Sequence, residues 1–206
     1  MFSTIIVNTV QKEVAGVEQE ETKKRIIKVT TQLIEQYNGD LDQITSRLIA
    51  EKAGIGLGSI NYYFKSKADL IALCVQQIIG GVIAQLDLDA AFQTDEQRLC
   101  AWANGVFEFL FAHPAIARVS ILGDLQHYTG GCNAVRTQQG FALALAEVQP
   151  PQDRAFLAFT LASAMQVAFL GGDTVHTLLG YDFKHKAGRA AYINKTVSVL
   201  LAGRKA

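Results

Sequence analysis

The sequence predicts an all-α fold with two helical domains. Apolar residues recur three or four positions apart along most of the 206 residues, which is the spacing of one face of an α-helix. No segment of any length shows the alternation of apolar and polar residues that half-buried strands have. Within residues 44–70, two short helical patterns meet at a glycine, as in a helix-turn-helix. The rest of the chain is organised around this segment.

The charge of the chain is unevenly distributed. The formal net charge is 0 and half of the residues are hydrophobic, so the chain can form one sizeable core or two smaller ones. Residues 22–67 contain eight Lys and Arg against four Asp and Glu, a net of +4, whereas residues 1–21 carry −3 and residues 68–206 carry −1. A basic segment beside a neutral one is typical of a nucleic-acid-binding domain joined to a domain with another role.

Residues 1–21 are predicted to form an N-terminal arm. The apolar run of residues 5–7 is too short to cross a membrane and no basic region precedes it, so the pattern argues against a signal peptide. We predict no membrane association and a cytoplasmic location. As an alternative to a merely partly ordered arm, the segment could contact DNA or a partner subunit, although its acidic end argues against DNA.

The first helix is predicted over residues 21–37. Its apolar stripe includes Ile26 and Ile34, which recur at helical spacing. Asn38 and Gly39 follow, and both residue types favour the left-handed conformation in which many helices end. The pattern therefore predicts a helix that ends just before this pair.

The helix-turn-helix depends on three positions. Ala50 is small where two steeply crossing helices must approach closely, and Gly54 can adopt the left-handed conformation that a tight turn needs. Ile60 then faces back into the angle between the helices. Asp42 or Thr45 is the predicted N-cap of the first short helix. A plain helical hairpin in a core would share the pattern, but it would not usually expose Asn-Tyr-Tyr between lysines.

The second short helix is predicted to present a face suited to reading DNA. Its outward residues combine hydrogen-bonding and apolar tips, which can contact base edges and phosphates in a major groove. They are Leu57, Ser59, Asn61, Tyr62 and Tyr63.

The segment TSRLIAEKAGIGLGSINYYFKSKADL, from Thr45 to Leu70, resembles the DNA-binding signature of the tetracycline-repressor-like (TetR) family of transcriptional regulators. The resemblance covers roughly residues 22–73. Leu48 stands where the family usually has a polar residue, and Asn61 stands where many members have tyrosine. The second departure bears on the DNA sequence that is read rather than on DNA binding.

The resemblance implies a division into an N-terminal three-helix helix-turn-helix DNA-binding domain over residues 22–70 and a helical ligand-binding and dimerisation domain over residues 87–206. A connecting helix over about 67–86 would join them, with Ser66 and Asp69 forming a capping box at its start. Together, the motif and the resemblance predict the DNA-binding residues Thr45, Arg47, Leu57, Ser59, Asn61, Tyr62, Tyr63, Lys65 and Lys67.

The second domain is predicted to be helical throughout. Thr94 caps a helix that runs to His113 and is apolar nearly all round, which predicts a central position. Pro114 starts the next helix, and Gly171-Gly172 is expected to end the fourth one. The further helices are predicted over 115–122, 132–148, 151–170 and 185–202.

The last two predicted helices have more apolar, small-residue surface than one core needs. In the family the corresponding pair forms a four-helix bundle across a dimer axis, so we predict a homodimer. Coverage of the second face within one chain is the alternative. In the family, a small molecule bound inside this domain shifts the connecting helix and weakens DNA binding.

The residue types in this domain indicate an apolar or aromatic effector with few charges. The aromatic and apolar candidates for its pocket lie at helical spacing, which core residues also show, and the polar ones lie in a glycine-rich loop. The predicted ligand-binding residues are Trp102, Phe107, Phe111, His127, Tyr128, Phe159, Met165 and Phe169.

Other chemistries have little support in the sequence. Cys74, Cys100 and Cys132 are widely spaced and none pair at metal-ligand spacing, so no metal or cofactor is predicted. The glycines of residues 54–58 follow no strand and therefore do not form a phosphate-binding loop. We predict a non-enzymatic, ligand-responsive regulator that binds a palindromic operator and, by family habit, represses. An all-α enzyme and a non-specific DNA-compacting protein are the alternatives.

Overall fold

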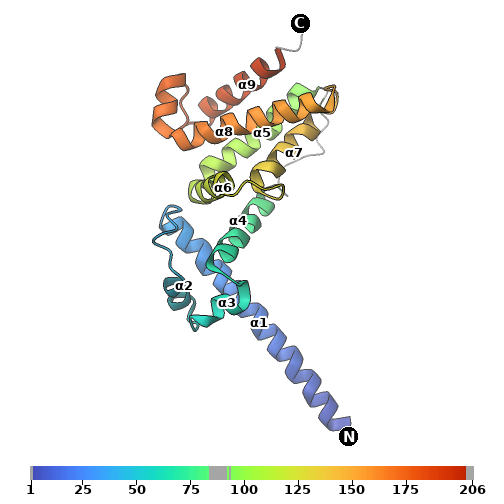
Figure 1. Ribbon diagram of the computed structural model, residues 1–206, viewed down its shortest axis with the longest axis vertical. Coiled ribbons are helices and arrows are strands. Elements are labelled where there is room, and N and C mark those ends of the chain that lie inside the picture. The colour runs from blue at the N-terminus through green and yellow to red at the C-terminus, as the bar shows by residue number, and fades with distance from the viewer. Residues whose placement is uncertain (1, 84–91, 93, 203–206) are drawn as a thin grey trace. The chain divides into compact units, whose positions relative to one another are not determined.

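The computed structural model describes the backbone of residues 2–83, 92 and 94–202, and the side chains of residues 16–81, 92 and 94–202. Within these residues every regular element is an α-helix (Figure 1), which confirms the predicted all-α class. The chain divides into two compact units, Met1–Ile78 and Ile79–Ala206. We call them the N-terminal unit and the C-terminal unit.

The first helix, α1 (Phe2–Gln36), begins much earlier than the sequence analysis predicted. The expected start at Glu21, after a separate arm, is wrong. Residues 2–20 contain no proline and a single glycine, Gly16, so no strong helix breaker separates them from the rest of the helix. The end of α1 is as predicted, because Asn38 and the following glycine have positive φ angles of 50° and 76°.

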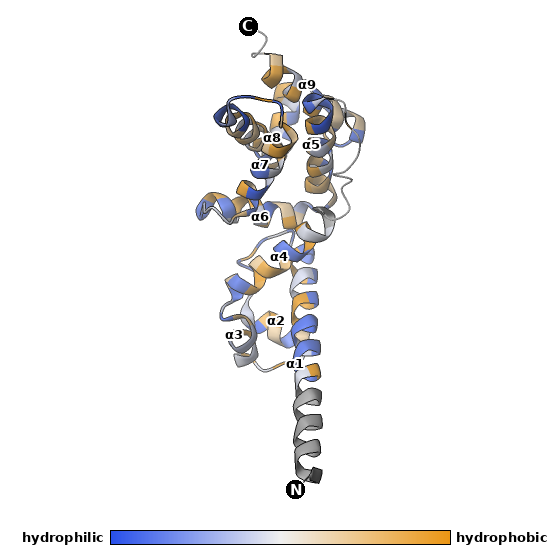
Figure 2. Ribbon diagram, turned by 90° about the vertical axis from the view of Figure 1, so that its right-hand side faces the viewer, coloured by the Kyte–Doolittle hydropathy of each residue, from blue (hydrophilic) through white to orange (hydrophobic). Residues whose placement is uncertain are grey.

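The N-terminal unit contains α1 and three further helices, which are α2 (Ser46–Ala53), α3 (Gly58–Phe64) and the first part of α4 (Lys67–Ile83). Helix α2 packs against both α1 and α3. In the coloured part of α1, Figure 2 shows both apolar and polar residues. Each helix contributes fully buried side chains to the core. These include Ile26, Ile34, Ile49, Ile60 and Leu70.

Helix α5 (Asp95–Ala112) is the central helix of the C-terminal unit, as predicted. It contacts α6 (Pro114–Gln126), α7 (Asn133–Ala144), α8 (Pro151–Leu179) and α9 (Lys186–Ala202) (Figure 1). Its N-cap is the predicted one, since Thr94 Oγ1 accepts a hydrogen bond from the Gln97 N–H at 3.2 Å. Side chains from several of its sides are buried, including Leu99, Ala103 and Phe107.

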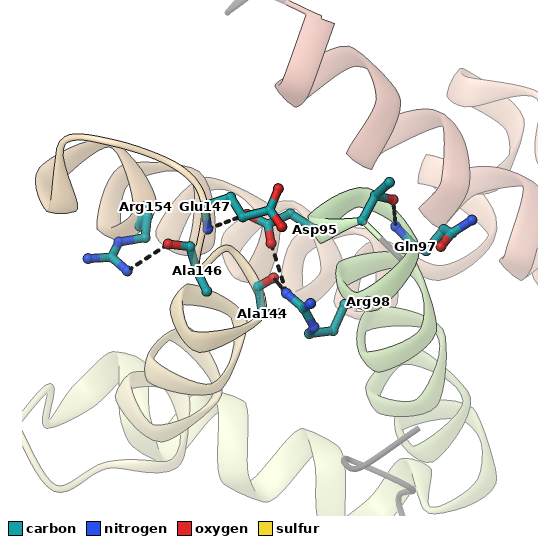
Figure 3. A network of polar contacts seen from close by, with 8 residues as sticks. Asp95, Gln97, Arg98, Ala144, Ala146, Glu147 and Arg154 are labelled. Atoms are coloured by element: carbon teal, nitrogen blue, oxygen red, sulfur yellow. Dashed lines mark hydrogen bonds and ion pairs between the residues drawn. The ribbon is translucent and has the colours of Figure 1, made fainter. Parts of the chain in front are cut away.

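A polar network joins the start of α5 to the end of α7 (Figure 3). The buried Asp95 carboxylate accepts from Arg98 Nη1 at 2.8 Å and from the Glu147 N–H at 2.8 Å. Arg98 Nη1 also donates to the Ala144 carbonyl at 2.9 Å, where a cation stabilises the carbonyl end of a helix. The network therefore fixes where α5 begins relative to α7.

Helix α8 is longer than predicted but is interrupted where the prediction ended it. Gly172 has φ 50° and ψ −131°, which is not helical, and the chain then continues in a helix to Leu179. Residues 173–179 contain no glycine or proline, so the helix resumes after one glycine in a conformation that other residues rarely adopt.

By length and composition, α8 and the bent pair α5–α6 could each cross a membrane. One side of α8, with Leu157, Leu161 and Met165, is buried.

An ion pair between α5 and α9 contributes to the stability of the C-terminal unit. Arg189 Nε and Nη2 each donate to one carboxylate oxygen of Glu108 at 2.7 Å, and both side chains are half-buried. The hydrogen bonds from Arg189 hold the pKa of Glu108 below its usual value. Such bidentate, charge-assisted bonds are stronger than neutral ones.

We predict that Glu108→Gln lowers the free energy of unfolding at pH 7 by about 1.5–3 kcal/mol, the range for hydrogen bonds to charged groups. Because the folded-state pKa of Glu108 is lowered, this stabilisation is complete above its unfolded value of 4.5 and is lost as the pH falls through the folded value. Denaturant unfolding from pH 7 to pH 3 should show that the free energies of unfolding of the wild type and Glu108→Gln converge in acid. Glu147→Gln, at an exposed position, is the control. An equal difference in free energy between the wild type and Glu108→Gln at every pH would contradict the assignment.

Candidate nucleic-acid interface

The turn between α2 and α3 has the geometry that the sequence predicts. Gly54 is in the left-handed conformation, with φ 63° and ψ 43°, and its N–H donates to the carbonyls of Ala50 and Glu51. The Ile55 N–H also donates to the Ala50 carbonyl, at 3.0 Å. Ala50 is buried and Ile60 is fully buried. The turn thus satisfies the last carbonyls of α2 while it redirects the chain into α3.

Exposed side chains lie on the outward face of α3 and at Leu57, the residue before it. Leu57 is 57% exposed and Tyr62 is 71% exposed, although burial is the usual fate of large apolar and aromatic residues. Asn61 is also exposed, whereas Ser59 and Tyr63 are half-buried. The rings of Tyr62 and Tyr63 meet edge to face, with centroids 5.0 Å apart, which restricts both side chains. The face offers one amide and one phenol hydroxyl to a ligand.

Thr45 is the N-cap of α2, so of the two predicted candidates it is the one that the structure selects. Its Oγ1 accepts from the Leu48 N–H at 3.1 Å, which leaves the hydroxyl hydrogen available as a donor. The first N–H groups of a helix have no intrahelical partner, and they favour an anion. Arg47 is exposed in this first turn. The start of α2 can therefore bind a phosphate.

The capping box at the start of α4 is also as predicted. Ser66 Oγ accepts from the Asp69 N–H at 3.0 Å and donates to the Asp69 carboxylate at 2.6 Å. Lys67 Nζ donates to the Leu41 and Ile44 carbonyls, both at 3.0 Å. The sequence analysis predicted Lys67 only as a DNA-binding residue. No local pattern indicates these two carbonyls, because they lie more than twenty residues away in sequence. A lysine has three donors, so one remains. Lys65 is exposed with φ 67°.

A cavity lies within the C-terminal unit. Its apolar lining comes from α5, α6 and α8 and from Ile79, and it includes Phe109, Leu110, Ile121 and Met165. Its polar lining is gathered mainly on α6 and α7. The polar residues are Ser120, Asp124, Asn133, Thr137 and Gln166.

Of the eight predicted ligand-binding residues, the structure brings only Met165 to the lining of this cavity. Phe107, Phe111 and Phe169 pack together elsewhere, with ring centroids 5.1 Å apart for the first pair and 5.4 Å for the second. The buried Trp102 Nε1 has no acceptor among the described residues. The remaining predicted residues are exposed, and they are His127, Tyr128 and Phe159.

The sequence analysis predicted none of the polar lining residues. Ser120 and Asp124 are four residues apart and share a helix face, as do Asn133 and Thr137. That spacing is a signal in the sequence, but only the packing of α6 against α7 brings the two pairs together. Aromatic residues gave a stronger but misleading signal, because a core attracts them equally.

Comparisons with known proteins agree with this geometry. Residues 26–74 match the family model described as "Bacterial regulatory proteins, tetR family". Among solved structures, a TetR-like transcriptional regulator from Rhodococcus sp. RHA1 is similar with a TM-score of 0.60 at 18% identity, covering 90% of this chain and 96% of that one. A tetR-family regulator from Streptomyces coelicolor has a TM-score of 0.58 at 18% identity, covering 89% and 80%. No curated protein matches the chain.

The helix-turn-helix and the family match over residues 26–74 indicate a DNA-binding transcriptional regulator. Residues 26–74 match the DNA-binding region of the TetR family, as the resemblance of residues 45–70 predicted. The similarity to the two solved structures shows that 90% and 89% of this chain share their fold.

We predict that Lys67→Met changes two properties of the protein. Loss of the bonds to the Leu41 and Ile44 carbonyls should lower the free energy of unfolding by about 1–2 kcal/mol. Loss of a phosphate contact should reduce the slope of log affinity against log salt by about 1 on every duplex. Lys65→Met, at an exposed position, should reduce only the slope. If the slope of log affinity against log salt is unchanged in Lys67→Met, Lys67 does not contact a phosphate and only holds the loop between α1 and α2.

Proposed function

We propose that this protein is a repressor that binds a palindromic operator as a homodimer in the cytoplasm and is released by a small, largely apolar effector. The observation that carries the proposal is the exposed face at Leu57, Asn61 and Tyr62 beside two helix starts that can hold phosphates. Contacts to phosphates position such a domain, and contacts to base edges specify the sequence. Both kinds of contact are available here.

The full set proposed for DNA contact has distinct roles. The amide of Asn61 can donate and accept at a base edge, as amide side chains do with adenine, and Leu57 can contact a thymine methyl group. Thr45, Arg47 and the lysines would bind phosphates, because they offer donors or positive charge without base-specific geometry. The half-buried Ser59 and Tyr63 would contribute where α3 enters the groove.

An exposed apolar stripe on α8 supports a homodimer. Phe156, Phe159 and Val167 lie on one helical face and are 68%, 51% and 63% exposed. Large exposed apolar patches on a folded domain mark interaction sites. A second copy of α8 offers the same surface, so a two-fold axis would cover both stripes at once. The proposal thus assigns Phe159 to the dimer rather than to a ligand pocket.

Helix α4 links the cavity to the DNA-binding surface in the proposed mechanism. Ile79 lines the cavity, and Lys67 of the same helix holds the loop before α2. A ligand that prefers a shifted α4 would move this loop and the start of α2. The ligand acts by population shift, so its effect cannot exceed its difference in affinity for the two states.

The experiment that tests the proposed function is selection from a random duplex pool at physiological salt. The selected duplex is then titrated against a scrambled one. We expect a palindrome that binds at least about a thousandfold more tightly than the scramble, as specific recognition does. Equal, weak binding to both would instead indicate non-specific DNA compaction, and the absence of binding would overturn the proposal.

The proposed roles on α3 predict different effects of two substitutions. Asn61→Ala should reduce the discrimination between the selected operator and its single-base variants by about 1–3 kcal/mol at one position. Tyr62→Phe, which removes a hydroxyl, should weaken binding to all duplexes alike. Fluorescence anisotropy on the operator and on each base variant separates these patterns. Unchanged affinity and discrimination in both variants would contradict the docking of α3 in the groove.

The proposed dimer predicts that Phe159→Glu gives a monomer that binds a half-site only. A carboxylate facing its symmetry mate would be desolvated beside an identical charge, which is unfavourable. Light scattering in solution measures the mass. Leu143→Glu is the matched control, because Leu143 is also an exposed apolar residue, on α7 and outside the stripe. A dimer that survives Phe159→Glu would exclude this face.

A further inference from the structure

Two hydrogen-bond donors at the polar end of the cavity bond to neighbouring residues of the same wall. Asn133 Nδ2 donates to Ser120 Oγ at 3.1 Å, and the Thr137 hydroxyl donates to the Asn133 carbonyl at 3.0 Å. A threonine hydroxyl has a single hydrogen to donate, so the remaining capacity of Thr137 is that of an acceptor. The wall formed by α6 and α7 therefore offers acceptors more than donors.

Asp124 adds a negative charge to the same wall. Its Oδ2 accepts from the Ala134 N–H at 2.7 Å, at the start of α7, and a carboxylate has about four lone-pair sites in all. Burial raises the pKa of Asp124 above its usual value, although hydrogen bonds from the start of α7 and the charge of Arg136 act in the opposite direction. The Ala134 and Asn133 N–H groups and the Cys132 thiol all donate to this carboxylate, so about one of its four acceptor sites remains for a ligand.

Asp124 is the one charged side chain among the described residues that line the cavity. No lysine, arginine or histidine is among the described residues that line it, and Arg136 is exposed on α7. An anionic ligand would therefore lose its hydration without gaining a counter-charge, which is unfavourable in a partly buried site. A ligand cation could pair with Asp124 instead.

The rest of the lining restricts the ligand to a small and apolar body. The cavity has a volume of about 70 Å³, well below the roughly 300–1,000 Å³ of sites for drug-sized molecules. Phe109, Leu110, Ile121 and Met165 surround this space and would cover an alkyl chain. Gln166 is half-buried on the opposite helix, and its amide can accept or donate one further hydrogen bond.

We propose that the cavity takes a small, singly charged alkylamine, with the ammonium group on Asp124 and Thr137 and the alkyl chain against the α5 and α8 side chains. This inference rests on the proposed function, because it names the chemical class of the effector for that regulator. An ammonium has three donors and no acceptor, which complements a wall of acceptors that carries one negative charge.

The test compares three probes of nearly the same shape on the full-length protein: isopentylamine, isopentanol and isovalerate. Binding is measured by NMR titration. The amine should bind about tenfold more tightly than the alcohol, because a charge-assisted hydrogen bond is roughly twice as strong as a neutral one, and isovalerate should bind most weakly. Equal affinities for amine and alcohol, a preference for isovalerate, or no binding of any probe would each overturn the inference.

Asp124→Asn tests the role of the carboxylate. The asparagine oxygen can still accept from the Ala134 N–H, so the start of α7 stays capped, and thermal unfolding checks the fold. In this variant the preference for the amine over the alcohol should disappear. The matched control is Asp153→Asn, at an exposed carboxylate in the first turn of α8, which should keep it. A preference that persists in Asp124→Asn would overturn the assignment.

The same samples separate this inference from the proposed function. The selected operator duplex is titrated with each protein in the presence and absence of isopentylamine. A protein that binds its operator specifically but does not prefer the amine overturns only the ligand class. A protein that prefers the amine but has no specific operator overturns the proposed function and leaves the cavity chemistry in place.

Discussion

The left-handed turn at Gly54 is the constraint on which the DNA-binding surface depends. It ends α2, satisfies the carbonyls of Ala50 and Glu51, and directs the chain so that Ile60 enters the core. A residue with a Cβ rarely adopts this conformation, so the angle between α2 and α3 follows from one position. Once that angle is set, the side chains that do not fit the core, Leu57 and Tyr62, point away from it.

The sequence predicted the N-terminal unit well because its determinants are local. Caps and turns depend on residues three or four positions apart, so Thr45, Gly54 and Ser66 could be assigned without knowledge of packing. The predicted start of α1 was wrong. Charge and composition suggested a boundary at Glu21, but no helix-breaking residue stands there. The bonds from Lys67 to Leu41 and Ile44 join distant residues, and no local pattern indicates them.

The C-terminal unit shows the limit of reasoning from helical periodicity. The central position of α5 followed from its apolar faces, but periodicity does not distinguish an aromatic residue in the core from one that lines a cavity. Phe107, Phe111 and Phe169 pack together in a cluster, whereas Phe159 is part of an exposed stripe. The polar residues that line the cavity lie mainly on α6 and α7. Those outcomes depend on which helices meet, which the sequence of each helix does not specify.

In the proposed function, α3 and the start of α2 bind the operator. Amide hydrogen exchange of the full-length protein, with and without the selected duplex, tests it most directly. We expect slower amide exchange on DNA binding in residues 45–48 and 57–64, with smaller changes in α5, α7 and α9. Protection confined to the C-terminal unit or to the first turns of α1, with none in α3, would contradict it.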